Sequence, residues 1–266
     1  MSIDIEIPIL DGEEWWASEA IDHSMTKKKF GIEFKDIKLE GYRNINELYE
    51  QHNQLHACET LFGDWDAEVM ILAQDAANFN TFKKMAKESH GNPFRHSPKI
   101  KTNQNLYEVI NSLKIFDLGS YEIPNNKNCG LYYANAIWLL KDSDGMSGSI
   151  TNTKDAYEEN KKVFDATVSN LPKLKLILTL GEHSFNFLKF CFGNQCCNDW
   201  HQSVEERRVI GVRAGESNLI IGSIYHTSNR GMIARAKRDG HSGRNSCSKG
   251  IEITKNDVEK IFSKLN

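Results

Sequence analysis

Four short apolar runs alternate with helical patterns, and this alternation constrains the fold more than any other feature of the chain. The runs have strand length and cover Ala67–Ala73, Leu131–Leu140, Leu174–Leu180 and Asn218–Tyr225. Continuously apolar strands are typical of a parallel sheet that is buried on both faces. The sequence therefore predicts an α/β fold, a three-layer α/β/α sandwich with a central, mainly parallel four-stranded sheet.

Helices are expected around these strands. Apolar spacing and end signals place them at Ile45–Leu61, Asn103–Leu113, Thr153–Leu171, Phe185–Phe192 and Lys255–Leu265. Ligands bind at the carboxyl ends of the strands in sheets of this kind. The residues that follow each run are therefore the first candidates for a site.

Charge is distributed unevenly along the chain. Residues 1–66 hold 15 acidic and 6 basic residues, whereas the formal net charge of the whole chain is -3. We expect an acidic helical extension over residues 1–60, packed on the core, and one further domain over 61–266. Basic stretches at 83–101 and 230–249 suggest a nucleic-acid-binding face, although solvated loops are the simpler explanation for such runs.

We expect a cytoplasmic protein. No apolar run approaches the roughly 18 residues that a membrane span needs, and the acidic N-terminus does not resemble a signal peptide. The six cysteines are then expected to be reduced thiols. Cys191, Cys196, Cys197 and His201 lie close together in sequence, but their spacing is not a standard zinc pattern, so we expect no metal there.

Polar residues occur at three of the expected strand ends. Asp75 follows the first run, Asn135 lies within the second, and His226 follows the fourth. Each alone is compatible with a structural role, such as a capping amide or a hydrogen-bonded core histidine. Together at one edge of one sheet they favour a functional site, because buried polar groups need partners that a ligand can supply.

Four segments resemble the motifs of one protein family. They are GDWDAEVMILAQDAAN at 63–78, LYYANAIWLLK at 131–141, LILTLGEHSFNFL at 176–188 and SIYHTSNRGM at 223–232. Their order and rough spacing are similar to those of the uracil-DNA glycosylase superfamily, over roughly residues 60–240. The family cleaves the N-glycosidic bond of a base flipped out of DNA.

The resemblance implies roles for individual residues. Asp75 would offset positive charge on the sugar and orient the attacking water, and His226 would donate a hydrogen bond to the leaving base. Residues expected to contact the base are Gln74, Ala77, Asn135 and one of Phe79 and Phe94. Residues expected against DNA are Thr227, Ser228, Asn229, Arg230, Met232 and Arg235, with Arg230 or Met232 as a wedge.

The first motif departs from the family pattern, and the departure leaves two candidates for the base that is excised. Ala76 replaces a proline, and Ala77 replaces the tyrosine that excludes 5-substituted bases in the best-known branch. Uracil is the expected base, and a C5-modified pyrimidine in foreign DNA is the alternative. The last motif also lacks its usual proline, since Thr227 follows His226.

The resemblance implies a monofunctional glycosylase that acts on DNA, with no cofactor, no membrane and no obligatory protein partner. Two other classes of function compete with it. One is a non-catalytic DNA- or base-binding module on the same fold, which the retained Asp75 and His226 disfavour. The other is a small-molecule hydrolase, which would bind DNA weakly and without steep dependence on salt.

Overall fold

A computed structural model describes residues 38–43, 64–75, 78, 80, 101–120, 129–142, 153–196 and 199–265. The chain divides into two compact units. The first comprises Met1–Phe62, Asp75–Ser97 and Ile137–Asn170, and the second comprises Gly63–Gln74, Pro98–Ala136 and Leu171–Asn266. The expected helix Ile45–Leu61 lies outside the described residues, and the expected domain boundary at residue 60 stays a prediction.

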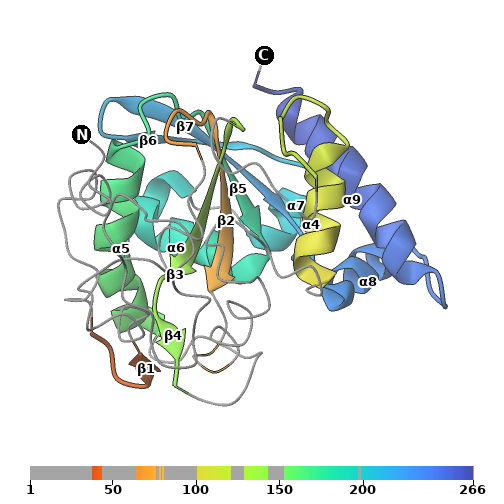
Figure 1. The fold of residues 1–266 in the computed structure, drawn as a ribbon, viewed down its shortest axis with the longest axis horizontal. Coiled ribbons are helices and arrows are strands. Elements are labelled where there is room, and N and C mark those ends of the chain that lie inside the picture. The colour runs from red at the N-terminus through yellow and green to blue at the C-terminus, as the bar shows by residue number, and fades with distance from the viewer. Residues whose placement is uncertain are drawn as a thin grey trace, which may run out of the picture. The chain divides into compact units, whose positions relative to one another are not determined.

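A five-stranded sheet forms the centre of the second unit (Figure 1). Its strand order is β3-β2-β5-β7-β6. The strands are β2 (Val69–Asp75), β3 (Leu131–Ile137), β5 (Leu176–Leu180), β6 (Ile210–Ala214) and β7 (Ser217–Ile224). Strand β5 is parallel to both β2 and β7, whereas β6 runs antiparallel to β7. The predicted α/β fold, with a mainly parallel sheet flanked by helices, is confirmed.

Strand β6 is the one strand of this sheet that the sequence did not predict. It lies at the edge of the sheet, and its side chains alternate between buried Ile210 and Val212 and exposed Gly211 and Arg213. An edge strand covered on one face alternates in this way and leaves no continuous apolar run. A turn at Gly215, which has a φ of 59°, returns the chain antiparallel into β7.

Both faces of the central strands are buried. One alternating set of strand residues joins side chains from the helices on that face in a single hydrophobic cluster. Its strand members are Val69, Ile71, Leu131, Leu176, Leu178, Leu180 and Ile224. The intervening residues Met70, Leu72, Ile177 and Ile221 are also fully buried. Burial on both faces explains why these strands appear in the sequence as continuous apolar runs.

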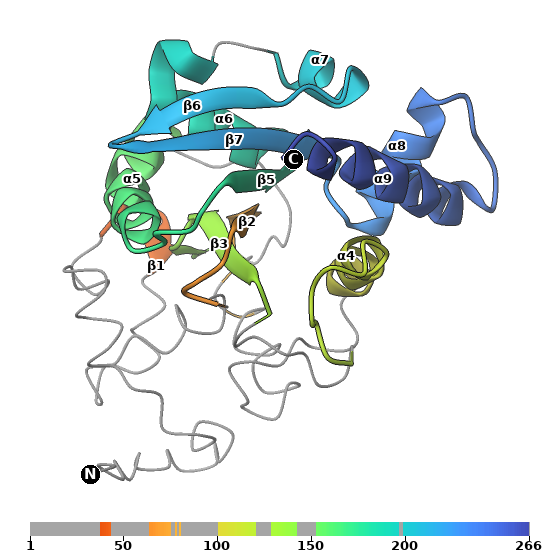
Figure 2. The same ribbon diagram turned by 90° about the horizontal axis from the view of Figure 1, so that it is seen from above.

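Three helices of the second unit lie side by side and cover the cluster (Figures 1 and 2). They are α4 (Lys101–Asn111), α8 (Asn229–Arg238) and α9 (Ser246–Phe262). Helix α6 (Glu182–Phe192) contacts β5, and α7 (Trp200–Glu205) contacts β7, with the short 3-10 helix η4 (Gly193–Cys196) between them. Among the described residues, no helix is both long and apolar enough to span a membrane.

Helix α8 falls where the sequence analysis expected a basic loop, and α9 begins nine residues before the predicted start. The sequence of α8 is polar, with buried positions at Met232, Arg235 and Ala236. These positions have helical spacing, but one of them is an arginine, so the apolar stripe is hidden. The beginning of α9 contains serine, cysteine and glycine, which are weak helix formers.

The described elements of the first unit are two short strands and one long helix. Strand β1 (Tyr42–Arg43) pairs antiparallel with β4 (Leu140–Lys141), and α5 covers Thr153–Ser169. The predicted strand 131–140 is interrupted because Trp138 donates its backbone N–H to the side chain of Asn160 at 2.7 Å. That N–H is therefore not available to a strand ladder, and β4 starts separately after it.

Gly250 allows the backbones of α8 and α9 to approach closely, and substitution of this glycine tests the contact. A Cβ atom at Gly250 would lie 1.9 Å from the carbonyl oxygen of Met232. Replacing an interior helix glycine by alanine normally stabilises a protein by about 1 kcal/mol. Here we expect Gly250→Ala to destabilise by about 1–3 kcal/mol, because the backbones of two helices must separate.

Urea unfolding of the Gly250→Ala variant measures this effect. Gly211→Ala is the matched control, since nothing lies within 4 Å of a Cβ at Gly211 and its stability should be unchanged or slightly raised. A Gly250→Ala variant as stable as the control would show that the two helices do not touch at this point.

Candidate functional site

Strands β2, β5 and β7 of the second unit end at the same edge of the sheet, because they are parallel neighbours. Gln74 lies in the last part of β2, half-buried, and Gly181 and His226 follow β5 and β7. Gly181 has a φ of 88° and donates its N–H to Ile224 at 2.9 Å. A Cβ at Gly181 would lie 3.2 Å from the Cβ of His226, so these two strand ends are in contact.

The imidazole of His226 is held by the turn that follows it. Its Nδ1 accepts a hydrogen bond from the backbone N–H of Ser228 at 3.2 Å. In the neutral ring the proton then lies on Nε2, which makes Nε2 a hydrogen-bond donor. The side chain is half-buried. The backbone of Ser228 thus orients His226 with Nε2 as the donor, and donation to a leaving base stays a prediction.

The turn itself is tight and forms the start of α8. The Oγ of Ser228 caps the helix by accepting from the backbone N–H of Gly231 at 3.2 Å. A Cβ at Gly231 would lie 1.9 Å from the carbonyl oxygen of His226, so only glycine fits there without a shift of the backbone. Asn229 and Arg230 are exposed in the first turn of α8. Asn229 and Arg230 are therefore accessible from solvent, and the contact of Ser228, Asn229 and Arg230 with DNA stays a prediction.

Helix α4 fixes the same turn from the other side through residues that sequence analysis missed. The side-chain amide of Asn105 donates to the carbonyl of Thr227 at 2.8 Å and to Oδ1 of Asn229 at 3.2 Å. The hydroxyl of Thr227 donates to the carbonyl of Thr102 at 3.1 Å. The one available signal was a polar residue, Asn105, at a buried position of an otherwise amphipathic helix.

Three residues predicted to face DNA are buried instead. Thr227 is fully buried and its hydroxyl is engaged by α4, so it braces the turn and does not present a phosphate-binding group. Met232 is fully buried in the core cluster and is not placed to act as a wedge. Arg235 is also buried, and its charge is neutralised within the protein.

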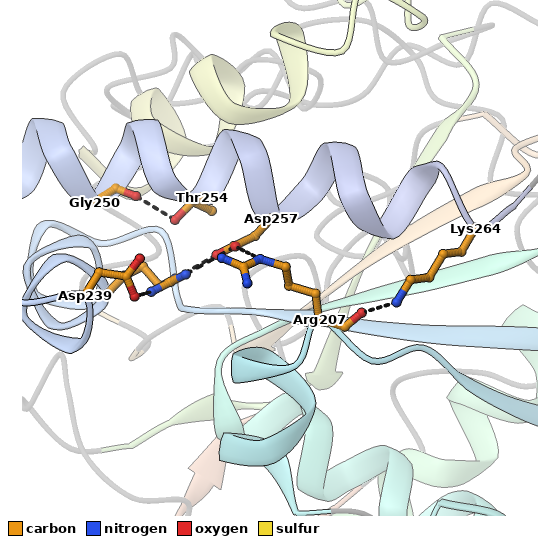
Figure 3. A network of polar contacts seen from close by, with 7 residues as sticks. Arg207, Asp239, Gly250, Thr254, Asp257 and Lys264 are labelled. Atoms are coloured by element: carbon orange, nitrogen blue, oxygen red, sulfur yellow. Dashed lines mark hydrogen bonds and ion pairs between the residues drawn. The ribbon is translucent and has the colours of Figure 1, made fainter.

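Arg235 belongs to a buried ion-pair network that joins α8, α9 and the segment before β6 (Figure 3). Its Nε donates to Oδ2 of Asp257 at 2.7 Å, and its Nη1 donates to Asp239 at 2.5 Å. Asp257 also accepts from Nε of Arg207 at 2.7 Å. Burial by itself would lower the pKa of Arg235, but the hydrogen bonds to Asp257 and Asp239 outweigh it and raise the pKa.

The network continues to the residue before His226. The guanidinium of Arg235 lies 5.9 Å from the ring centre of Tyr225, within cation–π distance. Tyr225 also makes an edge contact with Trp200 at 5.0 Å between ring centres. Burial raises the pKa of Tyr225, so its hydroxyl stays protonated at neutral pH.

Asn135 lies in β3 and is 4% exposed. Its Nδ2 has no hydrogen-bond acceptor among the described residues. A buried amide donor without an acceptor costs about 1–3 kcal/mol, so this atom is a candidate for contact with a bound ligand. Ala77, Phe79 and Phe94, which were also predicted to contact the base, lie outside the described residues.

Asp75 ends β2 and belongs, with Lys141 of β4, to the first unit. The Nζ of Lys141 lies 2.9 Å from Oδ2 of Asp75, and the side chains are 9% and 10% exposed. Lys141 is the last residue of the motif at 131–141, and the resemblance implies no role for it. No sequence signal marked it, because its partner lies 66 positions earlier in the chain.

The cysteine cluster does not form a recognisable metal site in the described part of the chain. Cys191 is half-buried in α6, Cys196 is buried in η4, and His201 is exposed in α7, where its ring contacts Trp200. Cys197 lies outside the described residues. Those residues contain no group of three or more potential metal ligands.

No family model matches this chain, and a search of curated proteins finds no match.

The hydrogen bonds from the side-chain amide of Asn105 to the turn that follows His226 lead to a stability prediction. Asn105→Asp preserves shape but replaces the donating amide nitrogen by a carboxylate oxygen, which faces two other acceptors, so the buried carbonyl of Thr227 loses its hydrogen-bond donor. We expect a loss of about 1–3 kcal/mol in the free energy of unfolding.

Asn103→Asp is the matched control, because it adds the same charge to the same helix near its N-terminus, where an acid is slightly favourable. Urea unfolding compares the two variants. Equal stabilities would show that Asn105 does not hold the turn.

Proposed function

We propose that the protein is a monofunctional DNA glycosylase, which hydrolyses the N-glycosidic bond of a flipped-out pyrimidine and leaves an abasic site. The base is uracil or a C5-modified pyrimidine in foreign DNA. The observation that carries the proposal is the His226 turn, in which the backbone of Ser228 orients the imidazole as a donor at the edge of the sheet. The proposal places the enzyme in the cytoplasm.

The chemistry needs a donor of this kind. When the C1′–N bond breaks, its electron pair goes to the base, and negative charge collects on a base oxygen. A preorganised donor such as Nε2 of His226 stabilises that charge by about 3–4 kcal/mol. Water then adds to C1′ and releases a proton, and the departed base takes up one proton.

Two further residues complete the proposed reaction. The carboxylate of Asp75 would offset the positive charge that develops on the sugar and orient the attacking water. The Nδ2 of Asn135, which has no acceptor among the described residues, would donate to an acceptor on the base edge. Ala77 would leave room beside C5 of the base, as its size suggests.

The start of α8 supports a role in holding the DNA backbone. The N-terminal N–H groups of a helix attract phosphate oxygens, and Ser228, Asn229 and Arg230 surround them here. Thr227, Met232 and Arg235 have no part in this contact because they are buried.

A base-release assay tests the proposed function. Uracil-containing DNA and DNA with bulky C5-modified cytosines are incubated with the protein, and alkali reveals abasic sites. We expect release from at least one of them, and a loss of roughly 100-fold or more in rate in Asp75→Asn and in His226→Ala, since each removes a charge-stabilising group.

Glu182→Gln and His183→Ala are the matched controls, because they are exposed residues of the same types at the start of α6. Both should keep the wild-type rate. Wild-type protein that binds both DNAs but releases no base would favour the non-catalytic binding module.

Arg230 provides a separate test of the DNA contact. Arg230→Ala should weaken binding to any DNA sequence and reduce the slope of log affinity against log salt by about 1, because one phosphate contact is lost. Fluorescence anisotropy at several salt concentrations measures the slope. Arg213→Ala in β6 is the control, because Arg213 is also exposed. An identical slope in both variants would show that Arg230 at the start of α8 does not contact DNA.

A further inference from the structure

The strongest unassigned feature is the buried ion pair between Lys141 and Asp75. Both side chains are about nine-tenths buried, and Nζ lies 2.9 Å from Oδ2. We propose that Lys141 is a positioning residue, which holds the Asp75 carboxylate in the orientation needed for base excision. This inference rests on the proposed function.

The backbone of Lys141 is held by its neighbours in the first unit. Lys141 pairs antiparallel with Tyr42 of β1, and Asn78 forms a parallel bridge with it. Asp142, the next residue, donates its N–H to the carbonyl of Gly41 at 3.1 Å. A lysine anchored in this way reaches a defined point, unlike a lysine on a solvated loop.

The contact at Oδ2 restricts the direction of the whole carboxylate. The carboxyl group is planar, so holding one oxygen restricts where the other one can point. A short hydrogen bond between charged groups is also stronger than one between neutral groups. Lys141 therefore restricts the orientation of the Asp75 carboxylate, which would orient the attacking water. In this role Lys141 does not itself touch the sugar or the base.

A purely structural ion pair would have the same appearance, and the two roles differ in what variants do. A structural pair affects stability and leaves the rate of the chemical step intact. A positioning residue affects the rate and acts through Asp75, so its loss has no further effect once Asp75 is replaced.

The experiment compares Lys141→Met and Lys141→Arg in single-turnover excision, with dissociation constants for the same DNA. We expect Lys141→Met to lower the rate on the order of 100-fold, as for a misplaced catalytic group, with binding nearly unchanged. Lys141→Arg keeps the charge and the donors and should recover most of the rate. Lys154→Met, an exposed lysine of α5, should match the wild type.

A double variant decides whether Lys141 acts through Asp75. Asp75→Asn with Lys141→Met should excise no more slowly than Asp75→Asn alone. An additional 100-fold loss would overturn the inference, as would a Lys141→Met variant with the wild-type rate. Circular dichroism shows which variants are folded. If Lys141→Met unfolds, the excision rate of Lys141→Arg, alone and combined with Asp75→Asn, is measured in its place.

Two further outcomes are distinguishable. If the wild type releases no base from either DNA, the proposed function fails and the role of Lys141 fails with it. If the DNA strand breaks without alkali, and borohydride traps a covalent adduct that Lys141→Arg does not form, then the amine of Lys141 attacks the sugar. That result would overturn the positioning role while base excision stands.

Discussion

The buried carboxylate of Asp257 is the constraint on which the C-terminal half of the second unit depends. It accepts hydrogen bonds from two arginines, one on α8 and one before β6, and its side chain is 2% exposed. Removing one partner of such a pair leaves an uncompensated charge and costs about 3–5 kcal/mol. The network therefore holds α8 and α9 in one arrangement, and Gly250 lets their backbones meet in it.

The position of His226 follows from that arrangement. Helix α8 begins at the turn that orients the imidazole, and Gly231 brings the first helical turn against the backbone of His226. On the other side, Asn105 of α4 ties the same turn through two hydrogen bonds. Ser228 and Gly231, inside the motif at 223–232, orient His226 directly, and Asn105, outside the motif, fixes the turn that carries them.

The sequence predicted the parts of the fold that depend on local apolar pattern. The four central strands and helices α4, α5 and α6 were found close to their observed bounds, because burial on two faces or on one stripe leaves a pattern in the chain. Strand β6 and helix α8 were missed, since half-exposed and charge-rich elements leave none.

The same reason explains the errors at the site, where Arg235 was assigned to DNA although Asp239 lies four positions away. Its buried partner Asp257 is 22 positions away, and burial against a distant counter-ion leaves no local sequence pattern. Lys141 was overlooked for the same reason. His226 and Ser228 lie in a turn and a helix cap that are local in the sequence, and their predicted roles toward a base and DNA stay predictions.

The charge that can face DNA is consequently smaller than the sequence suggests. Three of the six basic residues in the stretch 230–249 are paired with acids, namely Arg235 with Asp257 and Asp239, Arg238 with Glu205, and Lys249 with Glu252. Arg230, Lys237 and Arg244 are exposed and make no ion pair with any described residue. Each phosphate contact adds about one ion to the counterions released on binding, so the described part of this stretch can contribute about three. If this face contacts DNA, as proposed, so few free charges would make its binding to unmodified duplex DNA weak, and phosphate contacts alone would not discriminate between sequences.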